Sequence, residues 1–132
     1  MTSAGDIKKS EAVSTPEPTL RERVEAAVFA GVDPERIAID PGIGFGKEIE
    51  HNLTLMHGID ALLDLGRPVL VGPSRKRFIG TLLDLPEDQR VEGTAGAVAW
   101  VVARGVHVVR VHDVKEIVRV VRVIDAIARA DR

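Results

Sequence analysis

The sequence predicts an α/β fold in which short parallel strands alternate with helices. Three apolar runs start near residues 37, 69 and 106, and each is followed by a helical pattern. That spacing matches the roughly 30 or more residues of a βαβ unit with a right-handed crossover. Each run also ends at a compact charged cluster. Because ligand groups gather at the carboxyl ends of parallel strands, we expect the three clusters to share one site.

The N-terminal part is expected to be a leader followed by one helix. Residues 1–18 combine Ser, Thr, Glu, Lys and two prolines with few large apolar side chains, so we expect them to be disordered. Thr19 and Glu22 have the spacing of a capping box, and Gly31 is expected to end the helix. Its apolar face would comprise Leu20, Val24, Ala27 and Val28.

The remaining elements follow in alternation. We expect strands over Ile37–Asp40, Val69–Gly72 and Val106–Val111, and helices over Ile49–Leu65, Arg77–Leu83, Glu92–Arg104 and Val114–Ala130. The last helix is expected to turn an apolar stripe inward, formed by Val114, Ile117, Val118, Val121, Ile124 and Ala128.

Three βα units are too few for a closed eight-stranded barrel of about 250 residues. An arc of three strands would leave two sheet edges and an apolar concave face exposed. We therefore expect the chain to form a homodimer or to pair with a separate N-terminal half.

The composition favours a cytoplasmic protein that acts on small molecules. The chain has 18 Lys and Arg against 20 Asp and Glu, so we expect neither a nucleic-acid face nor a membrane patch. It has no cysteine, which excludes disulfides and thiolate metal sites. Three histidines lack metal-ligand spacing and are expected to be ordinary surface or capping residues, namely His51, His57 and His107. We expect no metal site.

The first charged cluster joins an acid to a glycine-rich turn. Gly42–Lys47 has neither the spacing of a dinucleotide fingerprint nor that of a Walker loop. It is either a plain tight turn or a turn whose backbone approaches a flat ligand. Asp40 can accept two N–H donors from an amidine-like ring edge, or it can serve as a turn acid before Pro41.

The other two clusters are basic. Ser74–Arg77 follows a buried strand directly, and it is either solvated surface or part of an anion site. Arg110 and His112 are two residues apart, so on a strand they would project from one face about 7 Å apart. They could clamp a phosphate or pyrophosphate, although Arg110 could instead form a salt bridge with a neighbouring acid.

The three clusters together resemble the last three strand motifs of the dihydropteroate synthases. The matching segments are Asp40–Lys47, Val71–Lys76 and Arg110–Val114, in the same order and at similar spacing, within a resemblance that spans residues 20–132. That family has a TIM-barrel fold. It condenses p-aminobenzoate with 6-hydroxymethyl-7,8-dihydropterin diphosphate and releases pyrophosphate. The resemblance implies a partial TIM barrel, the C-terminal portion of such an enzyme.

The resemblance also implies a set of site residues. Asp40 would hold the amino edge of the pterin and Lys76 its carbonyl oxygen. Arg110 would stack on the pterin and reach the diphosphate, which His112 would also contact. Lys76, Arg110 and His112 would be the catalytic residues, because charge develops on the leaving group. The p-aminobenzoate side would be bordered by Gly44, Phe45 and Lys47.

Two departures from the family pattern bear on function. Arg77 stands where many members have a serine that meets the aminobenzoate carboxylate, so it would pair with that carboxylate or fill its space. The family's Mg²⁺ ligand belongs to the half that has no counterpart here. Little activity is therefore expected of the chain alone. The alternatives are a non-catalytic pterin-binding or partner-binding module and, less favoured, a folate-dependent methyltransferase.

Overall fold

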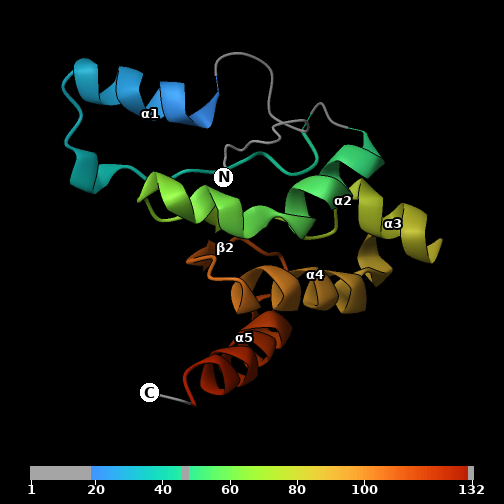
Figure 1. Ribbon diagram of the computed structural model, residues 1–132. Helices are drawn as coiled ribbons and strands as arrows, with labels where there is room; N and C mark the ends of the chain where they lie inside the picture. The colour runs from blue at the N-terminus through green and yellow to red at the C-terminus, as the bar shows by residue number, and fades with distance from the viewer. Residues whose placement is uncertain (1–18, 46–47, 131–132) are drawn as a thin grey trace.

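The computed structural model describes residues 19–45 and 48–130, and in these ranges helices surround a small parallel sheet (Figure 1). The helices are α1 (Leu20–Phe29), α2 (Ile49–His57), α3 (Arg77–Leu83), α4 (Val91–Ala103) and α5 (Val114–Ala128). Three 3₁₀ segments, η1 (Pro34–Arg36), η2 (Ile59–Leu65) and η3 (Glu87–Gln89), separate them. The strands are β1 (Leu70–Val71) and β2 (Val108–Val109). The predicted leader over residues 1–18 lies outside the described residues.

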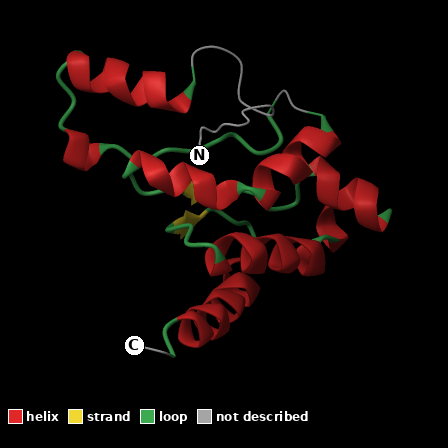
Figure 2. Cartoon of the chain, viewed as in Figure 1, coloured by secondary structure: helices red, strands yellow, loops and turns green. Residues whose placement is uncertain are grey.

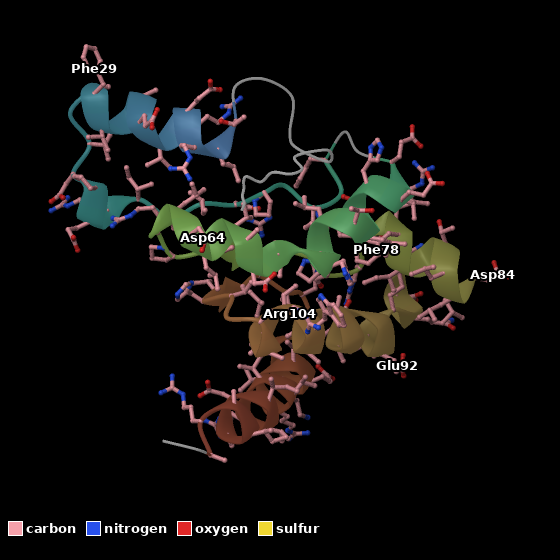
Figure 3. All side chains as sticks on the ribbon, in the orientation of Figure 1. Phe29, Asp64, Phe78, Asp84, Glu92 and Arg104 are labelled. Carbon is pink, nitrogen blue, oxygen red and sulfur yellow. The ribbon has the colours of Figure 1, made fainter. Side chains whose placement is uncertain are left out.

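Helix α1 begins where the sequence predicts. Thr19 Oγ1 accepts the backbone N–H of Glu22 at 3.2 Å, and a Glu22 carboxylate oxygen accepts the backbone N–H of Thr19 at 2.8 Å. The predicted apolar face is only half-buried, since no α1 residue is fully buried. Phe29 is 95% exposed and points away from the rest of the molecule at the end of the helix (Figure 3).

The sheet is parallel but shorter than expected. Figure 2 shows its two strands among the helices, with Leu70 paired to Val108 and Val71 to Val109. The predicted strand Ile37–Asp40 is wrong as a regular strand, because it makes one parallel bridge, between Ile39 and Val69.

The residues that follow each strand explain the short ladders. Pro41 and Pro73 carry no backbone N–H and so cannot donate to a ladder. The ladder after β2 ends with the Arg110 N–H donating to the Val71 carbonyl at 3.0 Å. The strand predictions Val69–Gly72 and Val106–Val111 are therefore wrong at their ends.

The predicted helix Ile49–Leu65 is wrong as one continuous helix. Helix α2 ends at Gly58, whose backbone has φ −103° and ψ 26°, and the chain continues as η2. Glycine loses more conformational entropy than other residues when it is held in a helix, which favours a break there. After the break Ile59 lies fully buried in the core.

The last helix is less covered than predicted. Ile117 is buried on α5, but Val114 and Val118 are 57% and 43% exposed. The described element packed most extensively on α5 is α4, and it covers only one side of the helix. The prediction that Val114 and Val118 face inward is therefore wrong for the described part of the chain.

One apolar core joins the strands to α2, α3 and α4. Its buried members are Ile39, Ile43, Met56, Ile59, Val69, Val71, Phe78, Ile79, Val101 and Val106. Two of the histidines have local structural contacts: His57 stacks on Trp100, and His107 Nδ1 accepts the Val69 N–H at 3.0 Å. Within residues 19–45 and 48–130, no helix is both long and apolar enough to cross a membrane.

Candidate functional site

Three loops follow the carboxyl ends of the parallel segments, at one end of the sheet. Ile39 bridges Val69, and β1 pairs with β2, so the loops that follow them are adjacent. The charges of Asp40 and Arg110 both act on the ammonium of Lys76, which lies in the loop after β1. Asp40 follows the bridged residue Ile39, and Arg110 follows β2. The structure thus brings these three predicted site residues together.

The glycine-rich loop is held by two side-chain acceptors. Asp40 Oδ1 accepts the Gly42 N–H at 2.8 Å, which is the turn role weighed as an alternative for this acid. The Gly44 N–H donates to Oδ1 of Asn52 at 2.9 Å. Gly42 and Gly44 have φ of 73° and 89°, a left-handed backbone that glycine adopts without strain.

Asn52 is a supporting residue that sequence reasoning missed. It is 3% exposed on α2, one turn before the buried Met56. A buried amide needs hydrogen-bond partners, and the Gly44 backbone supplies one. The signal in the sequence is an asparagine at helical spacing from Met56 and Ile59 on an otherwise apolar face.

Lys76 lies across the glycine loop. A β-carbon added at Gly44 would come within 2.9 Å of Lys76 Cδ, so a side chain at this position would force the lysine stem to shift. The ammonium Nζ lies 4.0 Å from the centre of the Phe45 ring, a cation–π distance. Burial lowers the pKa of Lys76, the positive charge of Arg110 lowers it further, and the negative charge of Asp40 opposes both.

Arg110 follows β2 and lies against the loop after β1. A β-carbon at Gly72 would be 3.1 Å from Arg110 Nη2, so the missing side chain of Gly72 leaves space for the guanidinium. Among the described residues, no acidic side chain forms an ion pair with Arg110. The salt bridge weighed as an alternative is therefore not seen there, and the exposed guanidinium remains accessible to an anion.

His112 is fixed by Ser74. The buried Ser74 Oγ accepts the backbone N–H of His112 at 3.0 Å and lies 2.8 Å from His112 Nδ1. Because β2 ends at Val109, the expectation that Arg110 and His112 project from one face of a strand is wrong. A serine hydroxyl, and not strand geometry, orients this histidine.

Arg75 and Asp113 join the same two loops a second time. Arg75 Nη2 donates to Asp113 Oδ1 at 2.9 Å, and its Nε donates to Oδ2 at 3.3 Å. The hydrogen bond from Arg75 holds the pKa of Asp113 below its ordinary value, with a further contribution from the guanidinium charge. Sequence reasoning treated Arg75 as part of a basic cluster and missed this pair, which spans 38 positions.

Arg77 lies apart from the cluster. It is exposed at the first position of α3 and lines a shallow depression with Thr81, Asp84 and Arg90. No described hydrogen bond or ion pair connects it with Lys76, Arg110 or His112. Lys47, predicted on the glycine loop, lies outside the described residues.

An apolar groove of about 360 Å³ is separate from the charged cluster. It lies between α2, α3 and α4, and its exposed rim includes Leu53, Leu82, Leu83 and Trp100. The Trp100 indole N–H donates to the Met56 carbonyl at 2.8 Å, which ties α4 to the end of α2. Within the described ranges, no group of three or more His, Cys, Asp or Glu residues is placed to hold a metal ion.

Comparison with known proteins places the chain in one enzyme family. The family described as "Pterin binding enzyme" matches residues 1–112. The dihydropteroate synthase of Bacillus subtilis (strain 168) is 50% identical over 107 residues, which are 81% of this chain and 38% of that protein. The dihydropteroate synthase of Escherichia coli (strain K12) is 38% identical over 105 residues, which are 80% of this chain and 37% of that protein.

Solved structures agree with the sequence matches. A Yersinia pestis dihydropteroate synthase in complex with a sulfonamide drug superposes with a TM-score of 0.82 at 37% identity, covering 83% of this chain and 40% of that one. A Xanthomonas albilineans dihydropteroate synthase with 4-aminobenzoic acid gives 0.79 at 43% identity, covering 82% and 40%. The chain thus spans less than two-fifths of the length of these curated relatives.

Proposed function

Because the chain belongs to the pterin-binding enzyme family, we propose that it is the C-terminal portion of a dihydropteroate synthase. In the reaction, the amino nitrogen of p-aminobenzoate forms a bond to the methylene carbon of 6-hydroxymethyl-7,8-dihydropterin diphosphate. The carbon–oxygen bond to the diphosphate breaks, pyrophosphate leaves, and the amine gives up a proton. The observation that carries the proposal is the meeting of Asp40, Lys76 and Arg110 beside the glycine loop.

The pterin would bind between Asp40 and Lys76. The hydrogen bond from Gly42 orients the Asp40 carboxylate, which has acceptor capacity left for ring N–H groups. Lys76 would donate to the pterin carbonyl oxygen. Its stem lies in the space that Gly44 leaves open, and its ammonium lies over the Phe45 ring.

The diphosphate would bind at Arg110 and His112. A guanidinium can hold phosphate oxygens through two parallel hydrogen bonds. His112 would contact the same diphosphate, with its ring held by Ser74. Their catalytic contribution, with that of Lys76, would be to stabilise the negative charge that grows on the departing pyrophosphate.

The aminobenzoate would lie on the outer side of the glycine loop. Gly44, Phe45 and Lys47 would border it, and Arg77 would pair with its carboxylate or occupy its space. Phe45 is 64% exposed, so its ring is accessible to an aromatic ligand. A neighbour of similar fold was solved with 4-aminobenzoic acid, which supports this class of substrate.

Magnesium is expected from the family resemblance. The resemblance places its ligand in the half of the family that has no counterpart here. The roles proposed for this chain's residues are therefore substrate binding and charge stabilisation.

The described elements would form three βα units of a TIM barrel. The protein would be cytoplasmic, and binding to another chain would complete the barrel. Val108 on β2 and Val114 and Val118 on α5 are 43–57% exposed, and the apolar groove adds a second patch. Such patches favour burial against another chain, either a second copy or a polypeptide that supplies the N-terminal half. Light scattering should show a species larger than the monomer; a stable monomer would contradict this part of the proposal.

Two alternatives remain distinguishable. A non-catalytic pterin-binding module would bind the pterin without turnover, whereas a partner-binding module would not bind it at all. A folate-dependent methyltransferase is disfavoured by the combination of Ser74–Lys76 with Arg110 and His112.

Calorimetry with 6-hydroxymethyl-7,8-dihydropterin diphosphate tests the proposal. We expect heat of binding, and we expect Asp40→Asn to abolish it, because the amide NH2 is a donor and cannot accept the second of two parallel pterin N–H groups. Asp33→Asn is a matched control, since Asp33 precedes Pro34 and its Oδ1 accepts the Glu35 N–H at 2.9 Å. Absence of binding by the unaltered chain would refute the pterin site.

A turnover assay completes the test. With p-aminobenzoate and Mg²⁺ added, we expect little pteroate from the chain alone. Addition of a polypeptide corresponding to the N-terminal half of a related synthase is expected to raise the rate. Pterin binding without any turnover under both conditions would favour the non-catalytic module.

A further inference from the structure

We propose that the Arg75–Asp113 ion pair is a positioning clamp that sets the spacing between Lys76 and His112. Arg75 immediately precedes Lys76 in the loop after β1, and Asp113 immediately follows His112 in the loop after β2. A tie between the outer pair therefore limits how far the inner pair can separate. The inference rests on the proposed function, because Lys76 and His112 have to meet one pterin diphosphate.

The pair has the geometry of a specific contact. Two guanidinium nitrogens, Nε and Nη2, donate to the two carboxylate oxygens at 3.3 and 2.9 Å. Side-chain exposure is 30% for Arg75 and 20% for Asp113, so water has limited access to either group. A contact through two hydrogen bonds fixes the orientation of the two side chains as well as their distance. A lysine in place of Arg75 could not form such a contact.

The backbone of Arg75 is held from two further sides. Its N–H donates to Oγ1 of the fully buried Thr94 at 3.1 Å, and its carbonyl accepts Arg90 Nη1 at 2.9 Å. Its φ of 57° lies in the left-handed region, which is unfavourable for a residue with a β-carbon. Such a conformation persists where surrounding contacts over-determine it.

Arg90 is itself fixed. Its Nε donates to the Leu85 carbonyl at 3.1 Å, and any β-carbon at Gly80 would overlap its guanidinium. Thr94 lies on α4, so the clamp rests on a helix that belongs to the core. Arg75 therefore fixes the loop that carries Lys76 relative to helix α4.

Asp113 shows a second sign of a dedicated role. It stands at the N-cap of α5, where an aspartate normally accepts an N–H of the first helical turn. Its side chain makes no capping hydrogen bond and instead receives both donors from Arg75. The capping interaction is given up in favour of the contact between loops.

Hydrogen exchange on the unliganded chain tests the clamp directly. The His112 N–H donates to Ser74 Oγ, and we expect this hydrogen bond to slow its exchange. We expect Arg75→Lys and Asp113→Asn each to speed its exchange by about threefold, and the double variant to add little more, because one contact is lost in every case. Exchange at Val98 and Val101 on α4 should be unchanged.

Asp125→Asn is the matched control. Asp125 accepts Arg129 Nε at 3.0 Å in an exposed ion pair on the same helix, far along the chain from His112. It should leave His112 exchange unaltered. Unchanged exchange in the clamp variants, or equal acceleration at His112 and Val101, would overturn the proposal, since the latter result indicates a general loss of stability.

Ligand titration separates positioning from binding. Inorganic pyrophosphate requires the cationic groups of both loops, whereas 6-hydroxymethylpterin without a diphosphate requires mainly Asp40 and Lys76. We expect Asp113→Asn to weaken pyrophosphate binding about threefold and to leave pterin binding unchanged. Equal weakening of both, or of neither, would contradict the clamp. If the unaltered chain binds neither probe, the proposed function fails, and hydrogen exchange still decides whether the pair positions His112.

Discussion

Ser74 and His112 contact each other twice, through the histidine backbone and through its ring. Ser74 Oγ accepts the His112 N–H at 3.0 Å and lies 2.8 Å from Nδ1. Because the oxygen already accepts one hydrogen bond, its own proton can be donated to Nδ1. We expect Ser74 to donate to Nδ1, which leaves the proton of a neutral His112 on Nε2.

Replacement of Ser74 should change both the stability of the protein and the tautomer of His112. We expect Ser74→Ala to lower the unfolding free energy by about 1 kcal/mol, because the partner N–H and ring nitrogen lose a buried contact. Nitrogen NMR should show the Nε2–H tautomer in the unaltered chain and a mixture in the variant. Thr81→Ala, which removes an exposed hydroxyl on α3, should change neither quantity. A protonated Nδ1 in the unaltered chain would contradict the assignment.

The charges of Asp40 and Arg110 should move the pKa of Lys76 in opposite directions. Arg110→Gln removes a positive neighbour and should raise the pKa of Lys76, whereas Asp40→Asn removes a negative one and should lower it further. NMR titration of the lysine side-chain signals measures both. Lys115, exposed on α5, is the internal reference. Shifts of the same sign in both variants would show that the three groups do not act on one another as described.

A methyl group at Gly44 should affect both folding and binding. We expect Gly44→Ala to cost about 1 kcal/mol of unfolding free energy, because φ is 89° there. It should also weaken pterin binding, since the new carbon would displace the Lys76 stem. Gly31→Ala is the control: φ is 106° there, but no atom lies within 4 Å of the added carbon. Equal pterin affinity in both variants would exclude a role for Gly44 in leaving space for Lys76.

Acid should weaken the Arg75–Asp113 pair. The folded-state pKa of Asp113 lies below its ordinary value of 3.8, so the folded protein favours the carboxylate. This contribution to stability is present above pH 3.8 and is lost as the pH falls through the folded-state pKa. The difference in unfolding free energy between the unaltered chain and Asp113→Asn should therefore shrink as the pH falls below 3.8. Urea unfolding at a series of pH values measures it; a constant difference would contradict the ion pair.

The local interactions of this chain could be predicted from its sequence. The capping box at Thr19 and Glu22 forms as expected, because both hydrogen bonds join residues three apart. Helix α3 has the bounds expected, Arg77 to Leu83, and α4 differs by one residue at each end. The three charged clusters were also visible, since each directly follows an apolar run.

Prediction failed where a residue's environment depends on distant parts of the chain. The extent of each strand depends on its neighbour, so the run from Ile37 to Asp40 became a single bridge. The inward face of α5 depends on which elements cover it, and the described part of the chain covers Ile117 but not Val114.

The sequence by itself determined the local helix signals, the order of the elements and the chemical types gathered at the strand ends. Only the tertiary structure decided which of those groups meet. Asn52 supports Gly44, Ser74 orients His112, and Arg75 pairs with Asp113 across 38 positions. The physical reason is that these contacts join loops whose separation is set by the packing of strands and helices, and no residue pattern within one loop encodes that distance.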